Sequence, residues 1–184
     1  MKTFCKLCFF LILLPLVLIS CVTTPGDRSV LVDVNDPDRI RFSGKGSAAG
    51  IMLMGAMGPM GIAIGAAIDE GIGKEISVAA SHVDFDLDEL IRKAVFEEPC
   101  VISSVTVRYY GFKMVSGSDD LAAPSLDIIL SSDTVESMGL KYPGSENEET
   151  LSAPLGDLKK DGERVSELLG QAFKELLAKA CSQK

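Results

Sequence analysis

The chain has 184 residues, of which 24% are charged and 47% apolar, and its formal net charge is −8. An acidic chain of this kind repels the phosphate backbone of nucleic acids, so we expect no nucleic-acid partner. With no tryptophan and one histidine, the sequence holds little material for a metal site or an aromatic ligand cleft, and we expect no metal and no cofactor.

Residues 1–20 have the order of a secretory signal. Two lysines lie within residues 1–6, and an apolar run over residues 7–18 follows, which is shorter than an ordinary membrane span. The motif LISC, which ends at Cys21, resembles the lipobox of bacterial lipoprotein precursors. In that family a leucine, a small residue and an obligatory cysteine occupy the matching positions.

This resemblance implies that the leader is removed and that Cys21 carries acyl chains, which hold the protein on a membrane. The mature chain then has 184 − 20 = 164 residues and, without two lysines of the leader, a net charge of −10. Residues 21–28 would be a polar tether. Val22 after the cysteine favours the outer membrane, so we expect a lipid-anchored protein of the bacterial envelope that faces the periplasm. An ordinary cleaved signal and an uncleaved N-terminal helix stay open as alternatives.

The cysteines of the mature chain form an even set. Cys5 and Cys8 leave with the leader and Cys21 is acylated, which leaves Cys100 and Cys181. In an oxidising compartment we expect these two to form a disulfide, worth roughly 4 kcal/mol in the chain-entropy model. The alternative is a pair of buried free thiols.

The first predicted element after the tether is a β-hairpin over residues 29–45. Residues 29–34 are rich in strand-forming residues and predict the first strand, and the sequence NDPD at residues 35–38 is typical of a turn. Residues 39–43 would form the returning strand of the hairpin.

A glycine-rich apolar segment follows over residues 46–75, and its first part, residues 46–68, contains no charge. As a straight helix those 23 residues would reach about 34 Å, long enough for a hydrocarbon core. Pro59 lies in the middle and favours a break into two short helices. We therefore expect an apolar helical hairpin near the N-terminus rather than a single membrane span.

Glycines in this segment have the spacing of a helix-packing stripe, and the segment resembles the glycine-zipper stretches of several bacterial envelope lipoproteins. The residues concerned are Gly46, Gly50, Gly58, Gly61 and Gly65. Such a stripe lets helix backbones approach closely, which implies membrane insertion or self-association. The alternative is a flexible hairpin that covers a core.

Residues 76–184 read as an α+β domain. A helix is predicted from Asp84 or Asp86 to about Glu98, where Asp86 and Glu89 fit a capping box and Pro99 ends the helix. Its apolar face would be Leu87, Leu90, Ile91, Ala94 and Val95.

Two strands and a last helix complete the domain. The first strand covers residues 101–110, with Val105, Val107 and Tyr109 on one face and Tyr110 on the other; the second covers residues 126–130. We expect residues 131–160 to be an irregular, acidic surface excursion with room for one further short strand. The last helix, residues 161–180, carries a continuous apolar stripe: Val165, Leu168, Leu169, Ala172, Phe173, Leu176, Leu177 and Ala180. The predicted fold is α+β, a small antiparallel sheet packed by two amphipathic helices.

The sequence contains no convincing motif for catalysis or for binding a nucleotide or a metal ion. Residues 44–50 (GKGSAAG) lack the residue order of a phosphate loop, and His82 has no nucleophile motif beside it. The carboxylates Asp84, Asp86, Asp88 and Glu89 do not follow a calcium-loop pattern, and capping a helix explains them better. We expect no catalytic residue and no enzyme.

The sequence therefore predicts a lipoprotein with a structural or accessory role, anchored through Cys21. Its glycine-rich segment would mediate membrane insertion or self-association, as a homo-oligomer or within an envelope protein complex. The alternative is a periplasmic lipoprotein that binds lipid or another apolar ligand, or that assists transport, with the segment covering a groove. A hydrolase centred on His82 comes third.

Overall fold

A computed structural model describes residues 29–132, 135–144 and 151–182. The predicted leader, the lipidated Cys21 and the tether lie outside these residues. Within them, none of the helices combines the length and apolarity that crossing a bilayer requires.

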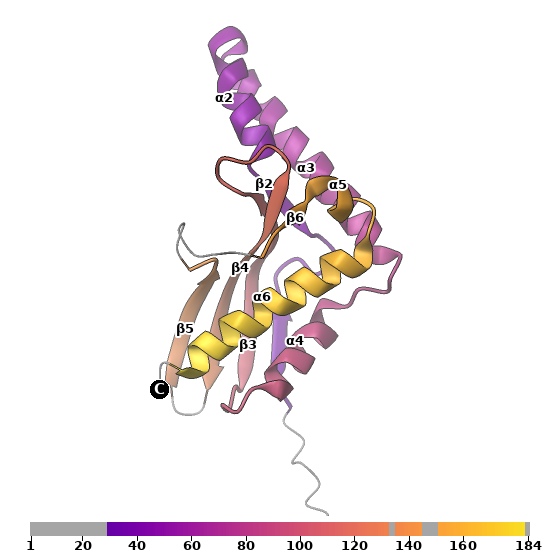
Figure 1. Cartoon of the computed structure of the whole chain (residues 1–184). Helices are drawn as coiled ribbons and strands as arrows, with labels where there is room; N and C mark the ends of the chain where they lie inside the picture. The colour runs from indigo at the N-terminus through magenta and orange to yellow at the C-terminus, as the bar shows by residue number, and fades with distance from the viewer. Residues whose placement is uncertain (1–28, 133–134, 145–150, 183–184) are drawn as a thin grey trace, which may run out of the picture.

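The described chain is α+β, which confirms the predicted fold class (Figure 1). Its strands are β1 (Leu31–Val34), β2 (Arg41–Ser43), β3 (Ser104–Met114), β4 (Leu121–Ser132), β5 (Val135–Tyr142) and β6 (Ala153–Pro154). Its helices are α2 (Lys45–Met57), α3 (Pro59–Ser81), α4 (Leu87–Glu97), α5 (Leu155–Leu158) and α6 (Gly162–Ser182).

The sheet is mixed, so the prediction of a purely antiparallel sheet is wrong. Its order is β1-β3-β4-β5, and β2 and β6 pair with β3 and β4 beyond this path. β1 and β2 both run parallel to β3, at its two ends, whereas β4 is antiparallel to both β3 and β5.

The predicted β-hairpin at residues 29–45 is also wrong, because β1 and β2 pair with β3 and not with each other. The turn between them is a local excursion. The Asn35 amide donates to the carbonyl of Val107, and the Tyr110 hydroxyl donates to the carbonyl of Pro37, so the chain stays along β3 and continues in the same direction.

The helices α4 and α6 cover one face of the sheet, as Figure 1 shows. Both were predicted from their apolar periodicity, and both are confirmed, as is the Asp86 cap, whose side chain accepts from the amides of Asp88 and Glu89. The apolar stripe of α6 is buried, with Phe173 fully inaccessible. The core between sheet and helices includes Phe112, Ile91, Leu126, Ile128, Leu168 and Leu169.

The strand β3 contains a bulge that reverses its side-chain pattern. Val107 pairs with Ile128 and Tyr109 pairs with the next residue, Asp127, so Arg108 is an extra residue. Val105 and Val107 face the core as expected, but beyond the bulge Tyr110 faces the core in place of Tyr109. The predicted orientation of these two tyrosines is therefore wrong.

The further strand that the sequence allowed within residues 131–160 is β5, eight residues paired along β4, so this segment is more regular than predicted. Its alternate residues Met138, Leu140 and Tyr142 lie opposite core residues of β4, which explains the pairing.

The helices α2 and α3 form an antiparallel pair that stands away from the sheet, beyond the end at which β2 lies (Figure 1). Among the described elements, α3 is the one against which α2 packs extensively, whereas the later turns of α3 pack on β2 and α6. We call residues 45–68, which protrude, the arm, and the remainder of the described chain the body.

Candidate functional site: an apolar helical arm

Glycine backbones form the contact between the two helices of the arm. A Cβ added to Gly46 would lie 1.9 Å from the carbonyl oxygen of Gly65, and one added to Gly65 would lie 2.2 Å from that of Gly46. One turn further along, a Cβ added to Gly50 would lie 3.1 Å from the carbonyl oxygen of Gly61, and one added to Gly61 would lie 2.6 Å from the backbone of Leu53 and Met54. The helices are in backbone contact at these four residues, which we call the seam, and any side chain there would separate them.

The structure brings four of the five predicted helix-packing glycines into the seam. The fifth, Gly58, forms the turn between α2 and α3 and has a φ of 61°, a conformation that favours glycine. Because both sides of the seam come from one chain, these glycines face inward and are not a surface for a second copy.

Large apolar side chains cover the outside of the arm. Met52 is 81% exposed and Ile51 is 69% exposed. Five more, on both helices, are 38% to 62% exposed: Met54, Met57, Met60, Ile62 and Ile68. Elsewhere in the described chain, exposed large apolar residues are scattered singly or in pairs, which is ordinary for a protein surface. Clusters of exposed apolar side chains like that of the arm are typical of interaction surfaces.

A carboxylate fixes the base of the arm. Asp69 on α3 accepts from the amide of Gly44 at 3.1 Å and from the amide of Gly46 at 2.6 Å, at the N-terminus of α2. A negative charge is favourable at this end of a helix. Asp69 thus occupies two of the amides that a phosphate would need at residues 44–50, and from Lys45 on these residues form the first turns of α2.

Beside the base lies a shallow groove of about 450 Å³ between β2 and α3. Its two arginines are already paired: Arg39 with Glu70 at 3.2 Å, and Arg41 with Asp36 at 3.3 Å. The guanidinium of Arg41 also lies 5.7 Å from the centre of the Tyr109 ring. Burial raises the pKa of Tyr109, against a smaller opposing effect of its hydrogen bond with Ser43. The groove offers no unpaired cluster that could bind a charged ligand.

The other residues weighed for chemistry lie apart from the arm and from one another. His82 is exposed at the C-terminal end of α3. Asp86 caps α4, and Asp88 pairs with Arg92 at 2.6 Å. Within the described ranges, no group of three or more histidine, cysteine, aspartate or glutamate side chains could hold a metal ion.

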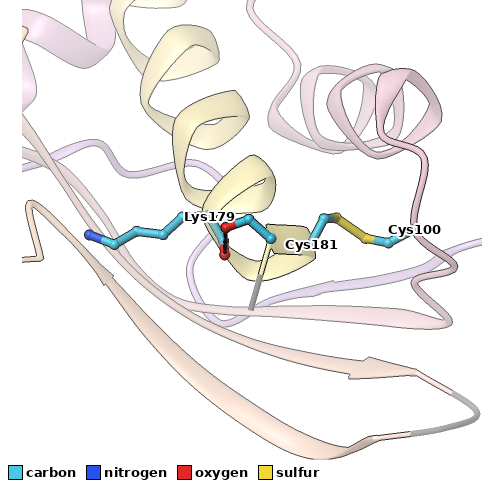
Figure 2. The surroundings of a disulfide bond; sticks show 4 residues. Cys100, Lys179 and Cys181 are labelled. Atoms are coloured by element: carbon cyan, nitrogen blue, oxygen red, sulfur yellow. Dashed lines mark hydrogen bonds between the residues drawn. A yellow bond between two sulfur atoms is a disulfide. The ribbon is translucent and has the colours of Figure 1, made fainter. Parts of the chain in front are cut away.

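The two cysteines predicted to pair lie together at the end of the body away from the arm. The sulfur atoms of Cys100 and Cys181 are 1.93 Å apart, and the disulfide joins residues separated by 81 positions (Figure 2). Cys181 lies at the end of α6 and Cys100 in the segment between α4 and β3, so the bond ties these parts of the body together.

Sequence reasoning missed the contact of Asp69 with the start of α2. The available signal was the first acidic residue after the uncharged stretch, together with one glycine just before that stretch, Gly44, and one at its start, Gly46. What the arm offers chemically is apolar surface held in a fixed shape, not a set of reacting groups. No protein-family model, characterised protein or solved structure matches this chain.

Proposed function

We propose that the chain is a lipoprotein of the bacterial envelope, anchored through Cys21, with a structural or accessory role in which the arm is the working element. The apolar outside of the arm is covered in the working state, by a membrane or by other copies of the chain. One observation carries this proposal: seven large apolar side chains are exposed together on the arm, with Met52 81% exposed. Leaving this much apolar surface in water costs free energy in proportion to its area.

The competing role as an apolar-ligand carrier needs the arm to close over a groove of the body. In Figure 1 the arm instead points away from the sheet, and α2 packs on α3. The structural or accessory role therefore agrees better with the geometry.

The anchor and the arm are tested separately. Replacing Cys21 by serine should abolish acyl incorporation and precursor processing, measured by labelling cells with palmitate and comparing the sizes of the two proteins on a gel. Unchanged labelling, processing and fractionation would refute the lipoprotein assignment.

Coverage of the arm is measured by thiol accessibility in the full chain. Met60→Cys reports on the arm, and Glu163→Cys on the exposed surface of α6 is the matched control. In isolated membranes a hydrophilic maleimide should react at least about ten-fold more slowly at position 60 than at position 163, because a covered thiol is shielded from water. In urea and detergent the rates should converge. Equal rates in intact membranes would refute the proposed role of the arm.

A further inference from the structure

We infer that the arm enters one leaflet of a lipid bilayer, to about the midplane, without crossing it. This inference rests on the proposed function, because it names the partner that covers the arm. Four properties of the arm carry it: its length, the level at which charge begins, the breadth of the exposed surface, and the hydrogen bonding at its tip.

The length of the uncharged part matches half a bilayer. From Gly46 the helix α2 rises about 18 Å to the turn, and from the turn α3 descends about 15 Å to Ile68. The hydrocarbon core of a bilayer is about 30 Å thick, so one leaflet provides about 15 Å. Because the chain reverses at Gly58, both helices leave the hydrocarbon on the side from which they entered.

Charge begins at one level on both helices. Asp69 contacts the amides of Gly44 and Gly46, so the first charged residue after the arm lies beside the start of α2 and next to Lys45. One turn further down α3, Lys74 pairs with Glu70 at 3.3 Å, and Glu70 also pairs with Arg39. This belt of mixed charge suits the headgroup region, with only uncharged residues beyond it.

The exposed surface is too broad for a single flat partner. Among the exposed positions of α2, residues 51, 52, 54, 55 and 56 alone cover an arc of roughly 200° at 100° per residue. On α3, Met60 and Ile62 extend the exposed surface to the second helix. A docked protein covers one face of a hairpin, whereas lipid chains surround it, so the distribution favours lipid over a second copy.

Two backbone amides of the turn at the tip donate to backbone carbonyls, which lowers the cost of placing the turn in hydrocarbon. The amide of Gly58 donates to the carbonyl of Met54 at 2.9 Å, and that of Gly61 donates to the carbonyl of Gly58 at 3.0 Å. Pro59, between them, has no N–H to satisfy. No side chain from position 48 to position 68 is charged or carries a hydroxyl or amide group.

The test measures depth with the purified, acylated full chain in vesicles of phosphatidylethanolamine and phosphatidylglycerol. A fluorophore is attached at Met60→Cys near the tip, at Ile68→Cys near the base, or at Glu163→Cys on the body. The acyl chains carry bromine either near the bilayer centre or near the headgroup. We expect deep bromine to quench position 60 about three-fold more strongly than shallow bromine, the reverse order at position 68, and no quenching at position 163.

A charge at the tip provides the matched pair of variants. With the fluorophore at Met57→Cys, Met60→Lys should reduce deep quenching at least about ten-fold relative to Met60→Leu, because a lysine at the bilayer centre opposes insertion. Both variants must keep the Cys100–Cys181 disulfide and the protease resistance of the body, which shows that the fold is retained.

Two results would overturn the inference. Shallow quenching alone at position 60 would mean that the arm lies on the surface. Absence of quenching together with disulfide cross-links between copies at position 60 would mean that the arm self-associates. In both cases the maleimide test in native membranes still decides the proposed function. A slower reaction at position 60 than at position 163 would leave the proposed function standing, whereas equal rates would refute the proposed role of the arm together with its insertion into lipid.

Discussion

The arm and the body bring helices together by opposite means. In the body, α6 buries large side chains such as Phe173 and Leu169 against the sheet, and its polar face meets water. In the arm, α2 and α3 meet through glycine backbones, so their large side chains point outward. A seam of this kind gives a helix pair a defined shape without a hydrophobic core of its own. The body is thus built to be stable in water, whereas the arm is built to present apolar surface.

The largest expected effect lies in the body. Phe173→Ala removes a fully buried ring and should lower the free energy of unfolding by about 3–5 kcal/mol, since it leaves a cavity in the core. Phe96→Ala is the matched control, because Phe96 is 63% exposed on α4 and its loss should change stability by less than about 0.5 kcal/mol. Urea unfolding of the full chain in mild detergent, followed by circular dichroism, measures both. Similar losses in the two variants would contradict the assignment of the core.

The seam should respond to a single methyl group, with an effect confined to the arm. Gly65→Ala places a Cβ 2.2 Å from the carbonyl oxygen of Gly46, so the helices must separate. We expect a local cost of about 1–3 kcal/mol, seen as at least about ten-fold faster hydrogen exchange in α2 with unchanged exchange in α6.

The control for the seam is the same substitution at Gly71, also within α3. A Cβ there has nothing within 4 Å, so Gly71→Ala should stabilise the helix by roughly 0.5–1 kcal/mol. The two variants are therefore expected to have opposite signs. If Gly65→Ala leaves the exchange of α2 as slow as Gly71→Ala does, the seam does not hold the arm together.

The elements predicted correctly are those whose signals are local. Apolar residues at helical spacing predict the helices α4 and α6, and Asp86 and Pro99 predict the two ends of α4. The pairing of β1 and β2 with β3 depends on residues about 70 positions away, so a turn signal at residues 35–38 could not distinguish a hairpin from two parallel strands. The bulge at Arg108 likewise has no local signature strong enough to predict it.

For the candidate site, the sequence identified the glycines but not their use. Spacing by four places Gly46 and Gly50 on one helix face and Gly61 and Gly65 on another, yet it does not say whether these faces meet each other or a different molecule. The sequence also could not predict that Met52 and Ile51 are exposed to solvent. A segment that is apolar on all sides is compatible with a buried core as well as with a surface. Both facts follow from contacts between helices, which periodicity does not contain.

The smallest effect is expected where the arm joins the body. Asp69 accepts one amide with each carboxylate oxygen, so Asp69→Asn keeps one acceptor and turns an NH₂ group toward the other N–H. The loss of one charge-assisted hydrogen bond should cost about 1 kcal/mol, reduced here because the groups are only partly buried. Hydrogen exchange at Gly44 and Gly46 should accelerate, while urea unfolding of the body stays unchanged.

Glu70→Gln is the matched control for Asp69→Asn, because it removes the neighbouring carboxylate from exposed ion pairs with Arg39 and Lys74. Such pairs contribute little, so exchange at the two glycine amides should not change. Equal acceleration in both variants would mean that general negative charge at the base matters, and not the two hydrogen bonds. Acceleration in Asp69→Asn alone would show that one carboxylate sets the join between arm and body, since the seam above it is intact in both variants.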